Sequence, residues 1–273
     1  MTNGQQKERV DVLLVQRGLA ETREQAKRSI MAGIVYSAET RLDKPGEKIK
    51  IDAPLTVKGI AMKYVSRGGL KLEKALGVFD VSVENKIVLD IGSSTGGFTD
   101  CALQNGAKHC YALDVGTNQL AWKIRQDERV TVMERTNFRH ATSDMFKDGK
   151  PQFATIDVSF ISLKLILPPL KQIIEQNGDV IALVKPQFEA GKENVGKKGI
   201  VRDRNVHIDV LLKISEAAIQ EGFSVKGISF SPVTGGEGNI EFLFHLKSDE
   251  SPEQPFDKTA FTQLVDEAYA ALH

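Results

Sequence analysis

The sequence predicts an α/β protein in which a small N-terminal α/β module precedes a Rossmann-like, doubly wound domain. Apolar, strand-like segments alternate with amphipathic helical segments over residues 87–222, which is typical of a parallel sheet covered by helices. The first of these strands ends at Asp90 and continues through the turn Gly92–Gly97 into an apolar-periodic segment that begins at Phe98. Glycines allow the backbone to turn tightly and to approach a ligand beside a helix N-terminus.

This turn does not by itself identify a ligand. It lacks a full G-x-G-x-x-G, because Ser94 stands where the second glycine would be. Nicotinamide, flavin and S-adenosylmethionine domains all open with such a turn, and a strand-to-helix turn that binds nothing is the alternative. The segments that follow the turn therefore have to decide between these classes.

Composition and hydropathy place the chain among ordinary globular proteins. Of its 273 residues, 41% are hydrophobic and 26% are charged, which are typical values. No apolar run approaches the roughly 20 residues needed to span a bilayer, and Met1–Lys7 lacks the apolar core of a signal peptide. We therefore expect a cytoplasmic protein with no membrane partner.

The cysteines indicate buried thiols and no metal site. Cys101 falls on the first expected helix of the doubly wound domain, and Cys110 falls near its second strand. Two cysteines fit a reducing compartment, so we expect free thiols rather than a disulfide bridge. No Cys/His cluster has metal-ligand spacing, and the sequence predicts no metal.

The net charge is zero, but it is unevenly distributed. Residues 1–71 carry 14 Lys and Arg against 8 Asp and Glu, whereas the rest of the chain carries 22 against 28. A basic N-terminal part on an acidic body indicates an anionic partner such as nucleic acid. A basic surface that is merely solvated is the alternative.

Residues 8–52 have the features of a compact α/β module. Thr22 begins its second helix with the capping-box spacing Thr22-x-x-Gln25, and Gly33 stands where a helix ends in a left-handed residue. The expected elements are helices at Val10–Val15, stopping at Gly18, and from Thr22 to Gly33, and strands at Ile34–Tyr36 and Lys48–Ile51. Basic side chains crowd both helices, so positive charge can line one surface of the module.

The motif of this module resembles the S-four-type RNA-binding domain. The resemblance covers about sixty residues and rests on Arg9-Val10-Asp11-x-x-Leu14…Gly18…Thr22-Arg23-x-x-Ala26-x-x-x-Ile30-x-x-Gly33-x-Val35. The chain departs from the family after the first strand, where Ser37 and Ala38 replace the usual Asn. The resemblance implies that the two-helix face binds structured RNA through phosphates and shape rather than by reading bases. The side chains expected to bind RNA are Arg9, Arg17, Arg23, Lys27, Arg28 and Arg67.

A basic join at residues 53–66 leads into a short expected helix at Leu70–Gly77. Its apolar residues have helical spacing, and Gly77 is expected to end it. Lys71 lies on this helix, where a lysine is ordinarily solvated. The chain is expected to consist of residues 1–62 (RNA-binding module and linker), 63–247 (doubly wound domain) and 248–273 (linker and a C-terminal helix that packs on the body).

The doubly wound domain is expected to contain five parallel strands and a closing hairpin. The strands are Ile87–Asp90, Cys110–Asp114, Val130–Met133, Phe153–Asp157 and Val180–Lys185. The helices are Phe98–Asn105, Leu163–Gln176, in which Pro168 and Pro169 are expected to produce a kink, and Val206–Gly222. The hairpin is Ser224–Ser231 with Ile240–His245. This antiparallel close favours the seven-stranded S-adenosylmethionine-dependent methyltransferase arrangement over a dinucleotide dehydrogenase.

Charged side chains stand at three strand ends of this domain. Asp157 ends the fourth strand, Lys185 ends the fifth, and Glu241 lies at the start of the last. In open α/β sheets the ligand crevice lies at the carboxyl ends of the strands. A lysine that closes a buried apolar strand is costly unless it is paired, and these carboxylates are the expected partners.

These residues resemble the Lys-Asp-Lys-Glu tetrad of heat-shock-type (FtsJ-like) ribose 2′-O-methyltransferases. Over residues 8–246 the chain is more similar still to the TlyA family, also labelled hemolysin A. The motifs that carry the similarity are Ser66-Arg67-Gly68-Gly69-x-Lys71-Leu72, Asp90-Ile91-Gly92-Ser93-Ser94-Thr95-Gly96-Gly97-Phe98-Thr99-Asp100, Asp157-x-Ser159-Phe160-Ile161-Ser162 and Lys185-Pro186-Gln187-Phe188-Glu189. The resemblance implies the catalytic tetrad Lys71, Asp157, Lys185 and Glu241, with Glu237 as an alternative to Glu241.

The resemblance also implies S-adenosylmethionine as the methyl donor, with no metal. The donor is expected over the glycine-rich turn, with Asp114 holding its ribose and Asp90 near its methionine end. Asp114 follows Asp90 by 24 residues, near the expected spacing of a ribose-binding carboxylate. The expected donor-binding residues are Asp90, Gly92, Ser93, Ser94, Thr95, Gly96, Gly97, Phe98 and Asp114.

The implied reaction is methylation of a ribose 2′-hydroxyl, of cytidine, in ribosomal RNA or ribosomal subunits. Lys185 is the hypothetical base, which requires a depressed pKa that burial and Lys71 can provide. The alternative is that Lys185 only positions the oxygen. The basic segment Glu189–Arg204 is either a loop that closes on RNA or a plain surface insertion.

Three other functions remain open from the sequence. A non-catalytic RNA-binding ribosome assembly factor would keep the fold and bind the donor without methyl transfer. A membrane-acting hemolysin is suggested by the family label alone. A nicotinamide oxidoreductase shares only the opening turn.

Overall fold

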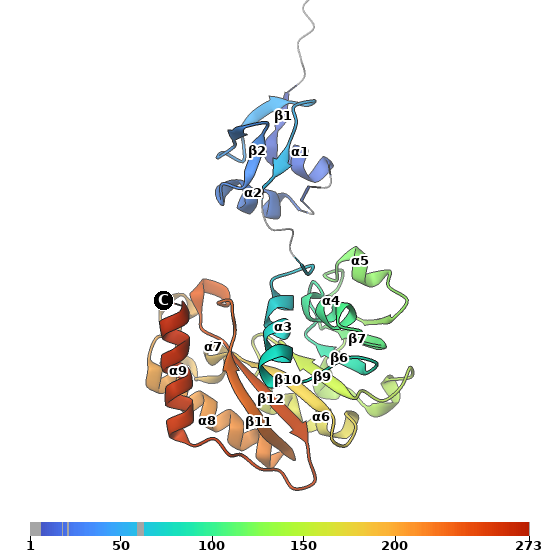
Figure 1. The fold of residues 1–273 in the computed structure, drawn as a ribbon, viewed down its shortest axis with the longest axis vertical. Coiled ribbons are helices and arrows are strands. Elements are labelled where there is room, and N and C mark those ends of the chain that lie inside the picture. Colours follow the sequence, from blue (N-terminus) through green and yellow to red (C-terminus); the bar gives the residue numbers. More distant parts are fainter. Residues whose placement is uncertain (1–6, 18, 21, 59–62, 273) are drawn as a thin grey trace, which may run out of the picture. The chain divides into compact units, whose positions relative to one another are not determined.

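The structure is a computed structural model that describes residues 7–17, 19–20, 22–58 and 63–272. By its internal contacts the chain divides into two compact units, Met1–Ala61 and Met62–His273 (Figure 1). Each unit contains its own hydrophobic core. The expected end of the first helix at Gly18 lies outside the described residues.

The N-terminal unit packs two helices against short strands. Its elements are β1 (Lys7–Arg9), α1 (Val10–Gln16), α2 (Arg23–Met31), β2 (Val35–Ser37), β3 (Thr40–Arg41), β4 (Lys48–Lys50) and β5 (Thr56–Val57). The strands form two small sheets, β1–β4 and β3–β2–β5. The Thr22 hydroxyl accepts a hydrogen bond from the backbone N–H of Gln25 at 3.2 Å, which begins α2 as expected. Gly33, just after α2, has a φ of +70°.

Two features of this unit concern the expected start of the join and the residues that follow β2. The join begins later than residue 53, because β5 pairs with β2 and so belongs to the sheet. Ala38, in the hairpin between β2 and β3, has a φ of +52°. Asn adopts this left-handed conformation more easily than Ala, so an Asn would be favoured at this position.

The larger unit is built on a seven-stranded sheet, which confirms the predicted fold class. Its strands are β6 (Ile87–Ile91), β7 (His109–Leu113), β8 (Val130–Met133), β9 (Phe153–Ile156), β10 (Asp179–Val184), β11 (Phe223–Phe230) and β12 (Phe242–Ser248). Their order is β11-β12-β10-β9-β6-β7-β8. The strands β10, β9, β6, β7 and β8 are parallel to one another. The strand β12 pairs antiparallel with both β10 and β11.

Helices cover both faces of this sheet (Figure 1). They are α3 (Gly68–Phe79), α4 (Gly97–Gln104), α5 (Trp122–Arg125), α6 (Leu167–Ile173), α7 (Pro186–Glu189), α8 (Arg204–Gln220) and α9 (Lys258–Leu272). Buried residues of α3, α4 and α5 share one core with one face of the strands, and those of α6, α8 and α9 share a second core with the other face. The helix α9 thus packs on the body, as expected.

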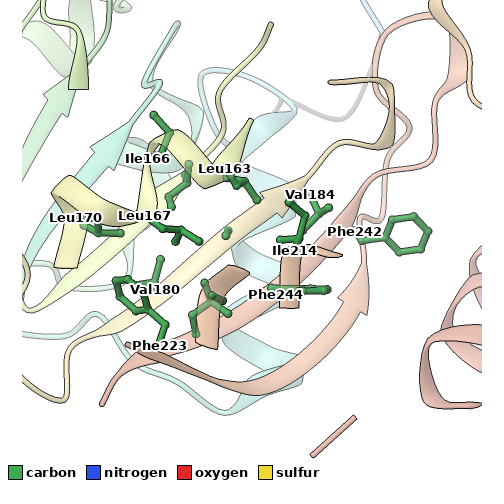
Figure 2. Packing of buried hydrophobic residues seen from close by; sticks show 14 of the residues in the cluster. Leu163, Ile166, Leu167, Leu170, Val180, Val184, Ile214, Phe223, Phe242 and Phe244 are labelled. Atoms are coloured by element: carbon green, nitrogen blue, oxygen red, sulfur yellow. The ribbon is translucent and has the colours of Figure 1, made fainter. Parts of the chain in front are cut away.

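Strand residues alternate between these two cores. Val88 contributes to the core under α3 and α4, whereas Leu89 contributes to the core under α6 and α8. Figure 2 shows the second core, where Val180 and Phe244 from the sheet meet Ile214 from α8. Each such buried side chain contributes about 1.5–3 kcal/mol of hydrophobic stabilisation. This packing fixes the strand ends from which the site is built.

Two helix predictions were wrong in detail. The helix α3 passes through Gly77 and ends at Phe79, because Phe79 packs against Gly227 and the ring of His245. The expected helix Leu163–Gln176 is instead a 3₁₀ turn, Leu163–Leu165, followed by α6. Pro168 and Pro169 lie in the first turn of α6, where no backbone N–H is needed, so they begin the helix rather than kink it.

Candidate active site

Two lysines and two carboxylates meet in a cavity of about 370 Å³ in the larger unit. Lys71 comes from the first turns of α3, Asp157 follows β9, Lys185 follows β10, and Glu241 precedes β12. The Lys71 ammonium lies 2.7 Å from Glu241 Oε2 and 3.5 Å from Asp157 Oδ2. The Lys185 ammonium lies 2.5 Å from Asp157 Oδ1. Asp157 therefore bridges the two lysines.

Burial gives this cluster its electrostatic character. Lys71 and Lys185 are 9% and 8% exposed, and Glu241 is 2% exposed. Burial alone would lower the pKa of Lys71, but the carboxylates of Asp157 and Glu241 outweigh it and raise that pKa above its usual value. Lys71 is thus a fixed positive charge at neutral pH.

Two further side chains complete the cluster. Ser159 Oγ lies 3.2 Å from the Lys185 ammonium and accepts its hydrogen bond. Gln187 Nε2 donates to Glu241 Oε1 at 3.3 Å. Sequence reasoning did not assign a role to either, although both lie in the motifs that carry Asp157 and Lys185. By contrast, Glu237 is exposed and lines a different cavity.

The glycine-rich turn is held against the end of β9. Gly92 has a φ of +85°, and a Cβ there would lie 2.4 Å from the carbonyl oxygen of Asp157. Only glycine fits this position, because it tolerates both the conformation and the close approach. The turn continues through Ser94, which has a φ of +48°. The N-terminus of α4 follows at Gly97.

Asp114 closes the other side of this turn. Its carboxylate accepts hydrogen bonds from the backbone N–H groups of Ser94 at 2.8 Å and Gly116 at 2.7 Å. It also lines a second cavity of about 420 Å³, together with apolar side chains that include Phe138 and Ile161. The two cavities share Gly92, Ser94, Asp157 and Ser159 as lining residues.

The pair of cavities fits S-adenosylmethionine. An apolar pocket suits an adenine ring, the Asp114 carboxylate suits ribose hydroxyls, and the polar cavity beyond the turn suits a charged amino acid end. Of the expected donor residues, the following line at least one cavity: Gly92, Ser93, Ser94, Thr95, Gly97, Phe98 and Asp114.

Asp90 and Gly96 line neither cavity. Asp90 is 1% exposed, and its oxygens accept hydrogen bonds from the Thr99 N–H, the Thr99 hydroxyl and the Thr155 hydroxyl. Burial raises the pKa of Asp90 to about 6, although these hydrogen bonds oppose the rise. Leu120 packs behind Gly96. Both residues lie behind the turn, and their expected contact with the donor stays a prediction.

The loop that follows Asp157 is tied to α7. Glu189 accepts hydrogen bonds from the Ser162 hydroxyl at 2.6 Å and from the backbone N–H of Leu163 at 2.8 Å. Two residues before the first of these hydrogen bonds, Phe160 is 91% exposed with a φ of +62°, and its ring packs on that of Phe188. The motifs at 157–162 and 185–189 are therefore parts of one substructure.

Several of the expected RNA-binding side chains have partners within the N-terminal unit. Arg9 and Arg23 both contact the buried carboxylate of Asp11 at 2.9 Å, and Arg17 donates to the backbone carbonyl groups of Ile51 and Ala53. Lys27 pairs with Glu24, and Arg28 is exposed. Arg67 belongs to the larger unit, where it lines the tetrad cavity.

Other expectations concern metals, thiols and membranes. Cys101 and Cys110 are free and buried, as predicted. Within residues 7–17, 19–20, 22–58 and 63–272, no three His, Cys, Asp or Glu side chains are grouped as a metal site would require. Of the helices in the described part of the chain, none has the length and apolar character needed to cross a membrane.

The two units each match a known protein family. Residues 8–53 match the S4 domain, and residues 64–248 match the FtsJ-like methyltransferase domain. The larger unit is therefore a methyltransferase domain of the class that uses S-adenosylmethionine, and the smaller one is an RNA-binding S4 domain.

Several known proteins are similar to this chain over most of its length. The Bacillus subtilis protein named "Putative rRNA methyltransferase YqxC" is 67% identical, covering 97% of this chain and 95% of its own. The "16S/23S rRNA (cytidine-2'-O)-methyltransferase TlyA" of Mycobacterium tuberculosis is 41% identical, covering 88% and 90%. A solved structure, "Putative hemolysin from Streptococcus thermophilus", is 57% identical with a TM-score of 0.80, covering 98% of both chains. The chain belongs to the TlyA (hemolysin A) family, which confirms the resemblance seen in its motifs.

Proposed function

We propose that the protein transfers a methyl group from S-adenosylmethionine to a ribose 2′-hydroxyl of ribosomal RNA, with cytidine as the nucleoside. The observation that carries this proposal is the Lys71–Asp157–Lys185–Glu241 cluster beside the donor-binding turn. The names of relatives over nearly the full length support RNA as the substrate.

The cluster can supply a proton acceptor and a positive charge to a ribose hydroxyl. S-adenosylmethionine, when bound, supplies an electrophilic methyl group. A ribose hydroxyl is a poor nucleophile at neutral pH, so a nearby group has to accept its proton during attack. Lys185 is the candidate and would have to enter the step as a neutral amine, because the raised pKa of Lys71 keeps that lysine protonated. Lys71 then places a positive charge where negative charge develops on the attacking oxygen.

Asp157, Glu241 and Ser159 position the two lysines. Asp157 contacts the side-chain nitrogens of both lysines, Glu241 contacts Lys71, and Ser159 contacts Lys185. Holding reacting groups in alignment converts a bimolecular encounter into an effectively unimolecular step. The S4 unit binds RNA through Arg9, Arg17, Arg23, Lys27 and Arg28, and Arg67 contacts RNA at the mouth of the tetrad cavity.

The test is transfer of labelled methyl from S-adenosylmethionine to purified ribosomal subunits. We expect label in the RNA with the wild type, none above background with Lys185→Ala, and an unchanged rate with Lys213→Ala, which alters an exposed lysine of α8. Lys185→Arg keeps the charge but removes the base, so near-normal turnover in that variant would contradict the role of Lys185.

The same experiment distinguishes a methyltransferase from the main alternative, a non-catalytic RNA-binding assembly factor. A folded wild type that binds the donor but labels no subunit and no naked ribosomal RNA would favour a non-catalytic RNA-binding assembly factor. Lysis of red cells or vesicles by the purified protein, without methyl transfer, would instead favour a hemolysin.

A further inference from the structure

Asn239 is a buried amide that joins two loops beside the tetrad cavity. It is 3% exposed. Its Nδ2 group donates to the carbonyl oxygens of Gly199 at 2.9 Å and Gly236 at 3.0 Å, and its Oδ1 accepts from the Val201 N–H at 3.1 Å. A buried amide with both donors and its acceptor in use fixes the segments that it bonds.

The first of these segments is the glycine loop, residues 231–241, which ends at Glu241. Its residues Thr234 and Gly235 line the tetrad cavity. A Cβ on Gly235 would lie 2.1 Å from Glu241 Oε1, so the backbone of the loop touches the carboxylate that holds Lys71. The Gly235 N–H donates to the Asn239 carbonyl oxygen at 2.8 Å. The position of Glu241 therefore depends on the shape of this loop.

The second is the middle part of the basic segment Glu189–Arg204, residues 192–202, which leads into α8. Its exposed basic side chains are Lys192, Lys197, Lys198 and Arg202. Ile200 and Arg202 each line two cavities of about 430 Å³, whereas Val201 between them is buried in the hydrophobic core. Polar contacts also hold the segment, namely the Asn239 amide and a hydrogen bond from the Tyr269 hydroxyl to the Arg202 carbonyl oxygen at 2.6 Å.

We propose that Asn239 is a positioning residue that couples the basic segment to Glu241, so that phosphates bound by the segment and the carboxylate that holds Lys71 are placed together. The proposal rests on the function proposed above. Exposed lysines and arginines bind the phosphates of RNA without reading its bases. The basic segment would bind the RNA strand next to the target nucleotide. Because the segment is coupled to Glu241, this binding would align the ribose hydroxyl with the two lysines.

The variant that tests this coupling is Asn239→Asp. The carboxylate keeps an acceptor for the Val201 N–H, but it loses both donors and faces the carbonyl oxygens of Gly199 and Gly236. We expect kcat to fall about 100-fold, because small displacements of reacting groups lower the rate by about this factor. KM for the ribosomal subunit should rise several-fold. The dissociation constant of S-adenosylmethionine should change less than KM, because the side-chain hydrogen bonds of Asn239 go to Gly199, Val201 and Gly236 and not to the donor turn.

The matched control is Asn205→Asp, which places the same charge at an exposed position at the start of α8. It should leave kcat and both affinities unchanged. Asn239→Ser, which keeps one donor, should give intermediate values, and it serves as the test variant if Asn239→Asp does not fold. Unchanged kcat and KM in both Asn239 variants, with an active wild type, would overturn the inference.

A second measurement does not depend on activity. Amide hydrogen exchange of the free protein reports local opening of individual segments. In Asn239→Asp, peptides from both 196–202 and 233–241 should exchange faster than in the wild type and in Asn205→Asp. Faster exchange in only one segment, or in neither, would show that Asn239 does not couple them. A wild type that transfers no methyl would refute the proposed function, while this measurement would still decide the coupling.

Discussion

Lys71 and Glu241 are 170 positions apart in the chain, yet their ammonium and carboxylate groups lie 2.7 Å apart. One stands in the first turns of α3 and the other directly before β12, the strand nearest the C-terminus. Both side chains are buried, so the pair is not screened by solvent as a surface ion pair is. The fold therefore keeps one of the two lysines of the candidate site charged by bringing together the two ends of the methyltransferase domain.

Glu241→Gln should lower the rate of methyl transfer by about 100-fold or more. The change removes one of the two carboxylates that raise the pKa of Lys71. The uncharged amide of the new Gln side chain would hold the Lys71 ammonium more weakly. The control is Glu237→Gln, which alters an exposed carboxylate four residues earlier. Single-turnover rates under saturating donor compare the two variants. A larger loss in Glu237→Gln would assign the fourth tetrad position to Glu237.

Asp90 should make the stability of the methyltransferase domain depend on pH between about 4 and 6. Burial raises its pKa to about 6, so in this range the folded state binds more protons than the unfolded state. The free energy of unfolding then falls as pH rises through the range, by up to about 3 kcal/mol from this group.

Asp90→Asn removes that contribution while an amide still fits between Thr99 and Thr155. Urea unfolding of both proteins between pH 4 and 7 measures it. The difference in stability between wild type and variant should shift in favour of the variant as pH rises. Parallel pH profiles would show that Asp90 titrates alike in both states.

Gly92→Ala and Gly77→Ala form a matched pair with opposite expected effects. At Gly92 the new Cβ would meet the Asp157 carbonyl oxygen at 2.4 Å, in a backbone with positive φ. We expect a loss of at least about 1–2 kcal/mol of stability and weaker donor binding. At Gly77, inside α3, a Cβ meets no atom within 4 Å, so Ala should stabilise by about 0.5–1 kcal/mol. Thermal unfolding and calorimetric titration of the donor measure both variants, and equal effects would contradict the geometry of the turn.

Ala38→Asn should stabilise the S4 unit by about 0.5–1 kcal/mol, because a left-handed backbone costs Ala about 1–2 kcal/mol and Asn less. Ala38 has a φ of +52° in the hairpin that joins β2 and β3. Hydrogen exchange of the β2 and β3 amides in the full chain measures this local stability. Slower exchange is expected, with that of β6 to β12 unchanged. Faster exchange would mean that the hairpin does not need a left-handed residue there.

Local sequence features predicted the parts of the fold that depend on neighbouring residues. Apolar runs ending in charged residues located the strand ends that carry Asp157 and Lys185, and the spacing at Thr22 located the start of α2. The end of α3 was not predictable in this way. Gly77 is a plausible helix end from the sequence, but the contact of Phe79 with Gly227 joins residues about 150 positions apart and keeps the helix going.

For the candidate site, the sequence predicted which four residues meet but not the contacts that surround them. Family motifs identified the tetrad, and the structure brings its four side chains into one cavity. The position of Asp90 behind the turn was not predicted, because a carboxylate at a strand end can face either the ligand or the helix that follows. The contacts of Ser159 and Gln187 likewise depend on how two loops meet in space, which their sequence spacing does not specify.

The strand order has a consequence for how the chain is made. β12 lies between β10 and β11, so β11 has no partner strand in the sheet until the last strand has been synthesised and inserted. Until then β10 presents an unpaired edge, which is a site for wrong pairing. Lys71, Asp157 and Lys185 have all been translated by that stage, whereas Glu241 has not. A nascent chain therefore contains the glycine-rich turn and three members of the tetrad first, and the candidate site is complete only once β12 has inserted.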